Sequence, residues 1–216
     1  MSRKMARILG GGVMALMLTV TPALSFAQDK VETPKATPKR VDLKLAMRNL
    51  WGDHIFWIRN VALTTKLGDT EAAKVADEQV VQNAKAIAEA VVPYYGKAAG
   101  DKLFTLLAGH YGSVKDFMSA AFSANKAGMD SAKIKMINNA KDIAVFLSSA
   151  NPNWPEQTLL GALGSHGALH MAQIEQIHAK NFAAEAKIWE QEKAQVFQIA
   201  DVLSEGIVKQ FPQKFA

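Results

Sequence analysis

Three histidines and three side-chain amides recur at nearly even intervals along the chain and could together form a metal site. The residues are His54, Asn83, His110, Asn139, His166 and Gln195, and the steps between them are 29, 27, 29, 27 and 29. The histidines are therefore 56 residues apart, and so are the amides. Three imidazoles at one point are typical of catalytic zinc, and imidazole also suits copper, iron and nickel. The spacing makes a transition metal ion (Zn, Cu, Fe or Ni) the candidate cofactor.

The sequences around the three amides resemble one another. Residues 82–88 read QNAKAIA, residues 138–144 read NNAKDIA, and residues 194–200 read AQVFQIA, a fainter match. A fixed period of this kind indicates that one supersecondary unit has been copied. We therefore expect three helical hairpins with a 56-residue pseudo-repeat, each carrying one imidazole and one amide.

The elements that must position these side chains are helices. Apolar residues recur every three or four positions after residue 41, which predicts an all-α, up-and-down bundle of six helices. The midpoints between successive members of the series fall at residues 68–69, 96–97, 124–125, 152–153 and 180–181, at or beside the turns that we expect. We expect the second helix to end near Val92, before Pro93, and Asp130 or Ser131 to cap the fourth. Pro155 should be the first residue of the fifth helix.

Residues equally distant from a turn lie at the same height in such a bundle. At about 1.5 Å per residue, each of the six lies roughly 20 Å from its flanking turns. The six side chains are therefore predicted to form one layer across the middle of the bundle.

Two further residues extend this candidate site. His170 follows His166 by one helical turn on the same face and is a candidate fourth ligand. Glu192 precedes Gln195 by about one turn and is the acid that we place near the layer. The predicted ligands are thus His54, His110, His166 and His170, and the residues predicted to orient them are Asn83, Asn139, Gln195 and Glu192.

Two other functions fit the same residues. Each histidine could hydrogen-bond the amide of its own hairpin, so that the layer only fixes helix register in a non-enzymatic structural or interaction module. The protein could also carry a small apolar or haem-like ligand between helices: Gly161, Gly164 and Gly167 in the fifth helix indicate either close helix–helix packing or room for a ligand. The chain has no H-E-x-x-H, P-loop or G-x-S-x-G motif, so we assign neither catalytic residues nor a reaction.

The N-terminal residues have the features of an export signal. Residues 1–27 combine three basic residues, an apolar run and small residues before position 28, which predicts a cleaved signal peptide. We expect residues 28–40 to be a flexible tether, residues 41–216 to be a single helical domain, and the protein to be periplasmic or secreted. No stable membrane span is expected after processing.

Charge and cysteine content exclude several classes of partner and site. The leader carries three bases and no acid, and residues 28–40 carry four bases and two acids, which leaves 18 of each in residues 41–216. A neutral domain gives no electrostatic reason to bind nucleic acid. The chain has no cysteine, so disulfides and thiolate metal sites are excluded. A small ligand or a protein partner remains possible, and the oligomeric state is open.

Four segments resemble those of a known group of proteins. They are residues 50–54 (LWGDH), 93–96 (PYYG), 151–155 (NPNWP) and 206–212 (GIVKQFP). In these segments the chain resembles a family of small exported bacterial helical-bundle proteins without an established activity, over roughly residues 44–215. The resemblance implies a helical bundle and carries no site residue across.

Overall fold

The computed structural model describes residues 37–216, which form six α-helices and one short 3₁₀ helix. The predicted signal peptide and residues 28–36 of the predicted tether lie outside the described residues. The elements are α1 (Pro38–Leu67), α2 (Thr70–Tyr95), α3 (Lys97–Phe122), α4 (Lys126–Ala150), α5 (Glu156–His178), α6 (Phe182–Gln210) and η1 (Pro212–Lys214). The predicted all-α bundle of six helices is confirmed.

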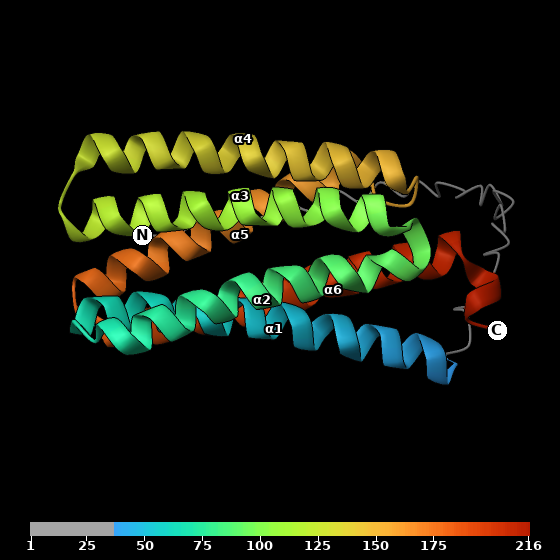
Figure 1. Ribbon diagram of the computed structural model, residues 1–216, viewed down its shortest axis with the longest axis horizontal. Helices are drawn as coiled ribbons and strands as arrows, with labels where there is room; N and C mark the ends of the chain where they lie inside the picture. The colour runs from blue at the N-terminus through green and yellow to red at the C-terminus, as the bar shows by residue number, and fades with distance from the viewer. Residues whose placement is uncertain (1–36) are drawn as a thin grey trace, which may run out of the picture. The chain divides into compact units, whose positions relative to one another are not determined.

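The six helices close into a ring. Each helix packs against its neighbours in the sequence, and α6 returns to pack against α1. Figure 1 shows the helices running lengthwise, with the connections at the two ends of the bundle. Helix α5 also contacts α1 and α3, so the three helices that carry the histidines meet inside the ring.

The turns lie where the even spacing of the histidines and amides predicts them. Gly68 ends α1 with a left-handed φ of 78°, and Asp69 caps α2 by accepting a hydrogen bond of 3.0 Å from the backbone N–H of Ala72. Gly96, with φ of 81°, separates α2 from α3. Glycine adopts such φ values without the steric penalty of other residues. The other three connections lie at residues 123–125, 151–155 and 179–181.

Four predicted helix boundaries are wrong. Helix α2 continues through Pro93 to Tyr95. The carbonyl of Glu89, which loses its helical partner at Pro93, belongs to an exposed residue and can bond water instead. The other three differences concern N-termini: α1 already begins at Pro38, Asn125 rather than Asp130 or Ser131 caps α4, and Pro155 is the N-cap of α5 rather than its first residue.

The apolar core is divided into two clusters by the histidine layer. Trp51 and Ile55 on α1 belong to the cluster near the chain ends, which also holds Trp154 and Phe215. Ile58, one turn further along α1, belongs to the second cluster. His54 lies between them, so the polar layer is covered by hydrophobic packing on both sides.

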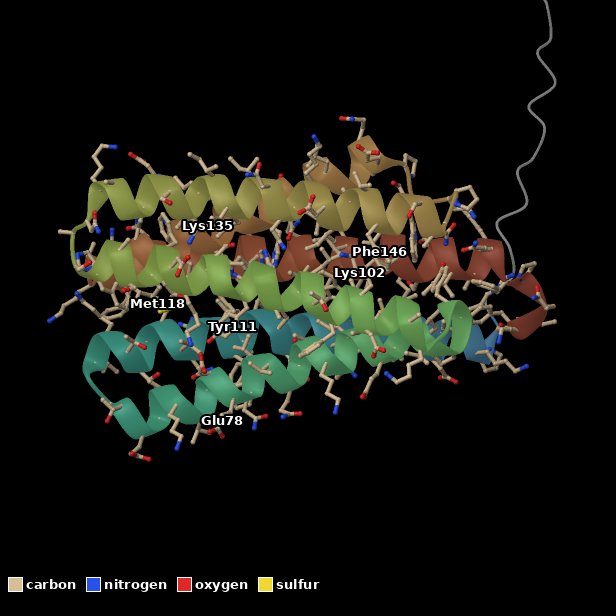
Figure 2. The ribbon with its side chains drawn as sticks, turned by 45° about the horizontal axis from the view of Figure 1, so that its top comes forward. Glu78, Lys102, Tyr111, Met118, Lys135 and Phe146 are labelled. Carbon is tan, nitrogen blue, oxygen red and sulfur yellow. The ribbon has the colours of Figure 1, made fainter. Side chains whose placement is uncertain are left out.

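The outside of the bundle carries many charged side chains. In Figure 2, Glu78 projects outward from α2, whereas Tyr111 on α3 lies at the boundary with α2, where its hydroxyl donates a hydrogen bond to Asp77. Within residues 37–216, no helix is both long and apolar enough to cross a bilayer.

Candidate metal centre

Four histidines from three helices converge at the centre of the bundle. His54 comes from α1, His110 from α3, and His166 and His170 from α5. Each offers one ring nitrogen, and the four nitrogens all lie within 4.8 Å of one another. The side chains are buried, with exposed fractions between 0% and 7%. The structure therefore brings together all four histidines that the sequence singles out.

The closest contacts in this histidine cluster join equivalent ring atoms. Nε2 of His170 lies 3.0 Å from Nε2 of His166 and 3.4 Å from Nε2 of His54. A neutral imidazole has one N–H and one lone pair, so His170 can make at most one favourable contact as a donor. Because two imidazole nitrogens face Nε2 of His170, one of the two contacts lacks a favourable hydrogen bond. A bound cation would remove this conflict, because all three nitrogens could then direct their lone pairs at it.

Burial keeps three of the rings neutral. It lowers the pKa of His110 to about 3, and it lowers the pKa of His54 and of His166 well below the ordinary value. The neighbouring imidazoles lower these pKa values further, because two positive charges at this separation repel each other strongly. At neutral pH the three rings are therefore unprotonated, which is the form that binds metals.

Glu192 on α6 lies next to the ring of His170, the fourth histidine of the cluster. Its Oε1 lies 3.0 Å from Nδ1 of His170, and both side chains are fully buried. The ring N–H is not aligned for an ordinary hydrogen bond, and Oε2 has no partner among residues 37–216. A carboxylate beside the outer nitrogen of a histidine is the usual arrangement behind a metal ligand. The acid predicted near the layer is therefore in contact with a predicted ligand.

The three amides make equivalent hydrogen bonds within their hairpins. In each case the side-chain N–H₂ donates to a backbone carbonyl 33 residues earlier, at the residue one turn before the histidine. The pairs are Asn83 with Leu50 at 2.9 Å, Asn139 with Leu106 at 2.9 Å, and Gln195 with Ala162 at 2.7 Å. The amide nitrogens thus tie the backbones of paired helices together and do not donate to the imidazoles.

These bonds fix the direction of each amide. Because a carbonyl only accepts, the amide nitrogen must face it and the amide oxygen must face away. Oδ1 of Asn83, Oδ1 of Asn139 and Oε1 of Gln195 are all buried without a hydrogen-bond partner in the described part of the chain. Burial and the other imidazoles lower the pKa of His166, whereas the side chain of Gln195 raises it. This effect indicates that the amide of Gln195 lies beside the His166 ring.

Four imidazole nitrogens are also buried without a hydrogen-bond partner. They are Nδ1 of His54, His166 and His170 and Nε2 of His110, again counting partners only within residues 37–216. Unpaired polar atoms in a core cost free energy, and native cores contain few of them. The concentration of such atoms in one cluster is typical of a ligand-binding site.

A second buried carboxylate lies two turns before Glu192 on α6, and the sequence analysis missed it. Glu185 accepts two hydrogen bonds from Arg59, of 2.6 and 2.9 Å, and a third of 3.0 Å from Gln173. Its side chain is 1% exposed, whereas that of Arg59 is 31% exposed. The available signal was the seven-residue step from Glu185 to Glu192, which places both acids on one helix face.

A small void borders the histidine cluster. It has a volume of about 20 Å³ and is lined by His54, His110 and His166 together with apolar side chains. A cavity of roughly 10–15 Å³ suffices for one water molecule. The void leaves room for one further small ligand next to these three rings.

Comparison with protein-family models, with curated proteins and with solved structures finds no match. Function must therefore be argued from the site itself. Its chemistry is that of four buried imidazole nitrogens with one carboxylate next to His170.

Proposed function

We propose that this protein binds one transition-metal ion through the ring nitrogens of His54, His110, His166 and His170. The observation that carries the proposal is the convergence of four buried imidazole nitrogens within 4.8 Å. Burial and repulsion between the rings lower the pKa values of His54, His110 and His166, so these imidazoles do not bind a second proton at neutral pH. A metal ion supplies the positive charge on which all four lone pairs can act.

The spacing of the nitrogens supports this proposal. A tetrahedral ion with nitrogen ligands at roughly 2.0–2.1 Å separates neighbouring ligands by about 3.3 Å. The two closest pairs, at 3.0 and 3.4 Å, fall on either side of this value. The remaining pairs of ligand nitrogens lie no more than 4.8 Å apart.

The surrounding polar groups support it further. Glu192 would accept a hydrogen bond from Nδ1–H of His170, which makes that ring a stronger ligand and offsets part of the charge of the ion. The unpaired amide oxygens of Asn83, Asn139 and Gln195 are acceptors, and the unpaired Nδ1 atoms of His54 and His166 are donors once Nε2 binds a metal. These groups can therefore orient the ligands.

The proposed role is that of an exported metal-binding protein. The void beside His54, His110 and His166 would admit one small additional ligand, such as water, to the ion. This arrangement suits storage, sensing, or simple hydrolytic or redox chemistry of a bound metal, and Zn, Cu, Fe and Ni all accept imidazole ligands.

Metal analysis of tag-free protein tests the proposal. We expect about one equivalent of metal per chain in the wild type and less than a tenth of that in the triple variant H54A/H110A/H166A. The matched control is H178A, since His178 lies on α5 outside the cluster, where it contacts Lys66; this variant should keep the full equivalent. Protein that remains metal-free when Zn²⁺, Cu²⁺, Fe²⁺ and Ni²⁺ are offered separately would overturn the proposal.

A second function is supported by the amides. Their three equivalent bonds to backbone carbonyls hold paired helices in register, as a structural or interaction module requires. If the histidines served only this purpose, single His→Ala variants would lose stability to the same extent with and without added metal. A metal-dependent difference in the urea midpoint between wild type and variant separates the two functions.

A further inference from the structure

An apolar cavity lies on one side of the histidine layer. Its volume is about 330 Å³. An apolar cavity of about 150 Å³ is sufficient to bind benzene. The space in this bundle can therefore hold a neutral molecule of up to about twice that size.

The lining of the cavity selects against charge. It consists mainly of aliphatic side chains and two tryptophans, and among residues 37–216 no charged side chain lines it. Met47, Leu103, Leu147, Leu159, Leu203 and Ile207 are representative, and all six are buried. A carboxylate or ammonium group would lose its hydration here without gaining an ion pair. The ligand that fits is neutral and largely apolar.

The cavity adjoins the histidine cluster. Trp51, Leu107 and Leu163 line both the cavity and the small void that borders His54, His110 and His166. The ring of Trp51 lies 5.9 Å from the rings of His54 and His166, between centroids. Only one layer of side chains therefore separates the apolar space from the imidazoles.

The cavity opens between α5 and α6. Thr158, Gly161 and Ser165 on α5, and Gln198 and Val202 on α6, line it and are exposed. A Cβ atom added at Gly161 would meet nothing within 4 Å. A small residue at this position leaves the entrance open, so that a molecule from solvent can reach the apolar interior.

We propose that this cavity binds a single small, neutral, apolar organic molecule and holds it beside the proposed metal. The proposal names the ligand class for the metal site, and in that respect it rests on the proposed function. The cavity argument itself depends only on the volume, the uncharged lining and the entrance beside Gly161.

The test uses the neutral fluorophore 1-aminoanthracene as the probe. Titrated into metal-free, tag-free protein, it should bind saturably at one site per chain, with increased fluorescence. The variants G161F and S165F place a ring in the entrance and should weaken binding at least tenfold. G164F is the matched control, because Gly164 is also exposed on α5 with open space around it but does not line the cavity.

Folding of each variant is checked by helical circular dichroism and by the urea midpoint. Because two blocking positions are used, failure of one variant to fold leaves the other as the test. The absence of saturable binding, or equal affinities for wild type, G161F, S165F and G164F, would overturn the cavity proposal.

A second measurement tests the link to the metal. Co²⁺ replaces the native ion, and its visible absorption spectrum reports changes in its surroundings. We expect saturating 1-aminoanthracene to shift this spectrum in wild type and G164F but not in G161F. An unchanged wild-type spectrum with the probe bound would overturn the link, whereas failure to bind any metal would refute the proposed function and leave the entrance-dependent binding result intact.

Discussion

His170 and Glu192 form a fully buried imidazole–carboxylate pair, 3.0 Å apart, that the other two hairpins do not contain. The residues 56 and twice 56 positions before His170 are Val114 and Ile58. Those before Glu192 are Met136 and Val80. All four of these residues are buried and apolar. The third hairpin thus has a polar pair where simple register packing would require only aliphatic side chains, which favours a ligand-binding role for the layer.

The first prediction concerns Glu192. We expect E192Q to weaken metal binding roughly 10- to 100-fold, because the amide no longer offers a charged acceptor to Nδ1–H of His170. The control is E190Q, since Glu190 is an exposed residue of the same helix and pairs with Lys193. Competition titration with a chromophoric chelator measures both affinities. Equal affinities for E192Q and E190Q would show that the carboxylate does not act on the site.

The second prediction concerns pH. The unfolded chain protonates its histidines near pH 6.5, whereas folded His110 stays neutral down to its pKa of about 3. The unfolded state therefore binds more protons below pH 6.5, and the stability of the metal-free protein must fall as the pH falls. Each such ring contributes up to about 1.4 kcal/mol per pH unit.

Urea unfolding of chelator-treated protein between pH 7.5 and 5 checks this pH dependence. His110→Leu should lower the slope of stability against pH below 6.5. A free energy of unfolding that stays constant over this range would mean that the rings are protonated in the fold.

The third prediction concerns Asn139. Its amide nitrogen donates to the carbonyl of Leu106, and Asn139→Asp would place a carboxylate oxygen against that carbonyl. We expect a loss of about 2–3 kcal/mol from the lost hydrogen bond and the unfavourable contact. The adjacent Asn138 is exposed, so Asn138→Asp is an isosteric control that should change stability by less than about 0.5 kcal/mol. Similar urea midpoints for the two variants would contradict the register role of the amide.

The fourth prediction concerns Arg59 and Glu185. Arg59→Met leaves a buried carboxylate without its charge partner and should cost about 3–5 kcal/mol. Adding Glu185→Met should recover most of that loss, because an apolar pair needs no compensation for lost hydration. Urea denaturation of the two single variants and the double variant forms a complete cycle. A double variant less stable than Arg59→Met alone would show that Glu185 has other partners that matter more than Arg59.

The sequence predicts the fold well because one spacing rule governs it. The even steps between histidines and amides place the turns, and glycine at Gly68 and Gly96 marks two of them with backbone angles that other residues avoid. The predicted end of α2 is wrong, because the helix continues through Pro93. Near a helix end, proline removes only one hydrogen bond, and the exposed carbonyl of Glu89 can bond water.

The candidate site is predicted less completely. Equal height brings the histidines together, but it gives no information on which atom of Asn83 faces the imidazoles. The 56-residue period also does not predict the contact of Arg59 with Glu185. The equivalent of Arg59 in the next hairpin is Lys115, which pairs with Asp77 instead. Such ion pairs depend on side-chain direction across helices that are far apart in the sequence.

No single hairpin holds a complete set of ligands, because the four imidazoles come from α1, α3 and α5. A chain truncated before residue 166 would present two of the four, too few to retain an ion firmly. Metal uptake would thus report that the whole ring has assembled. An ion that binds only the folded state shifts the folding equilibrium toward that state. The metal would therefore also stabilise the packing of the last hairpin.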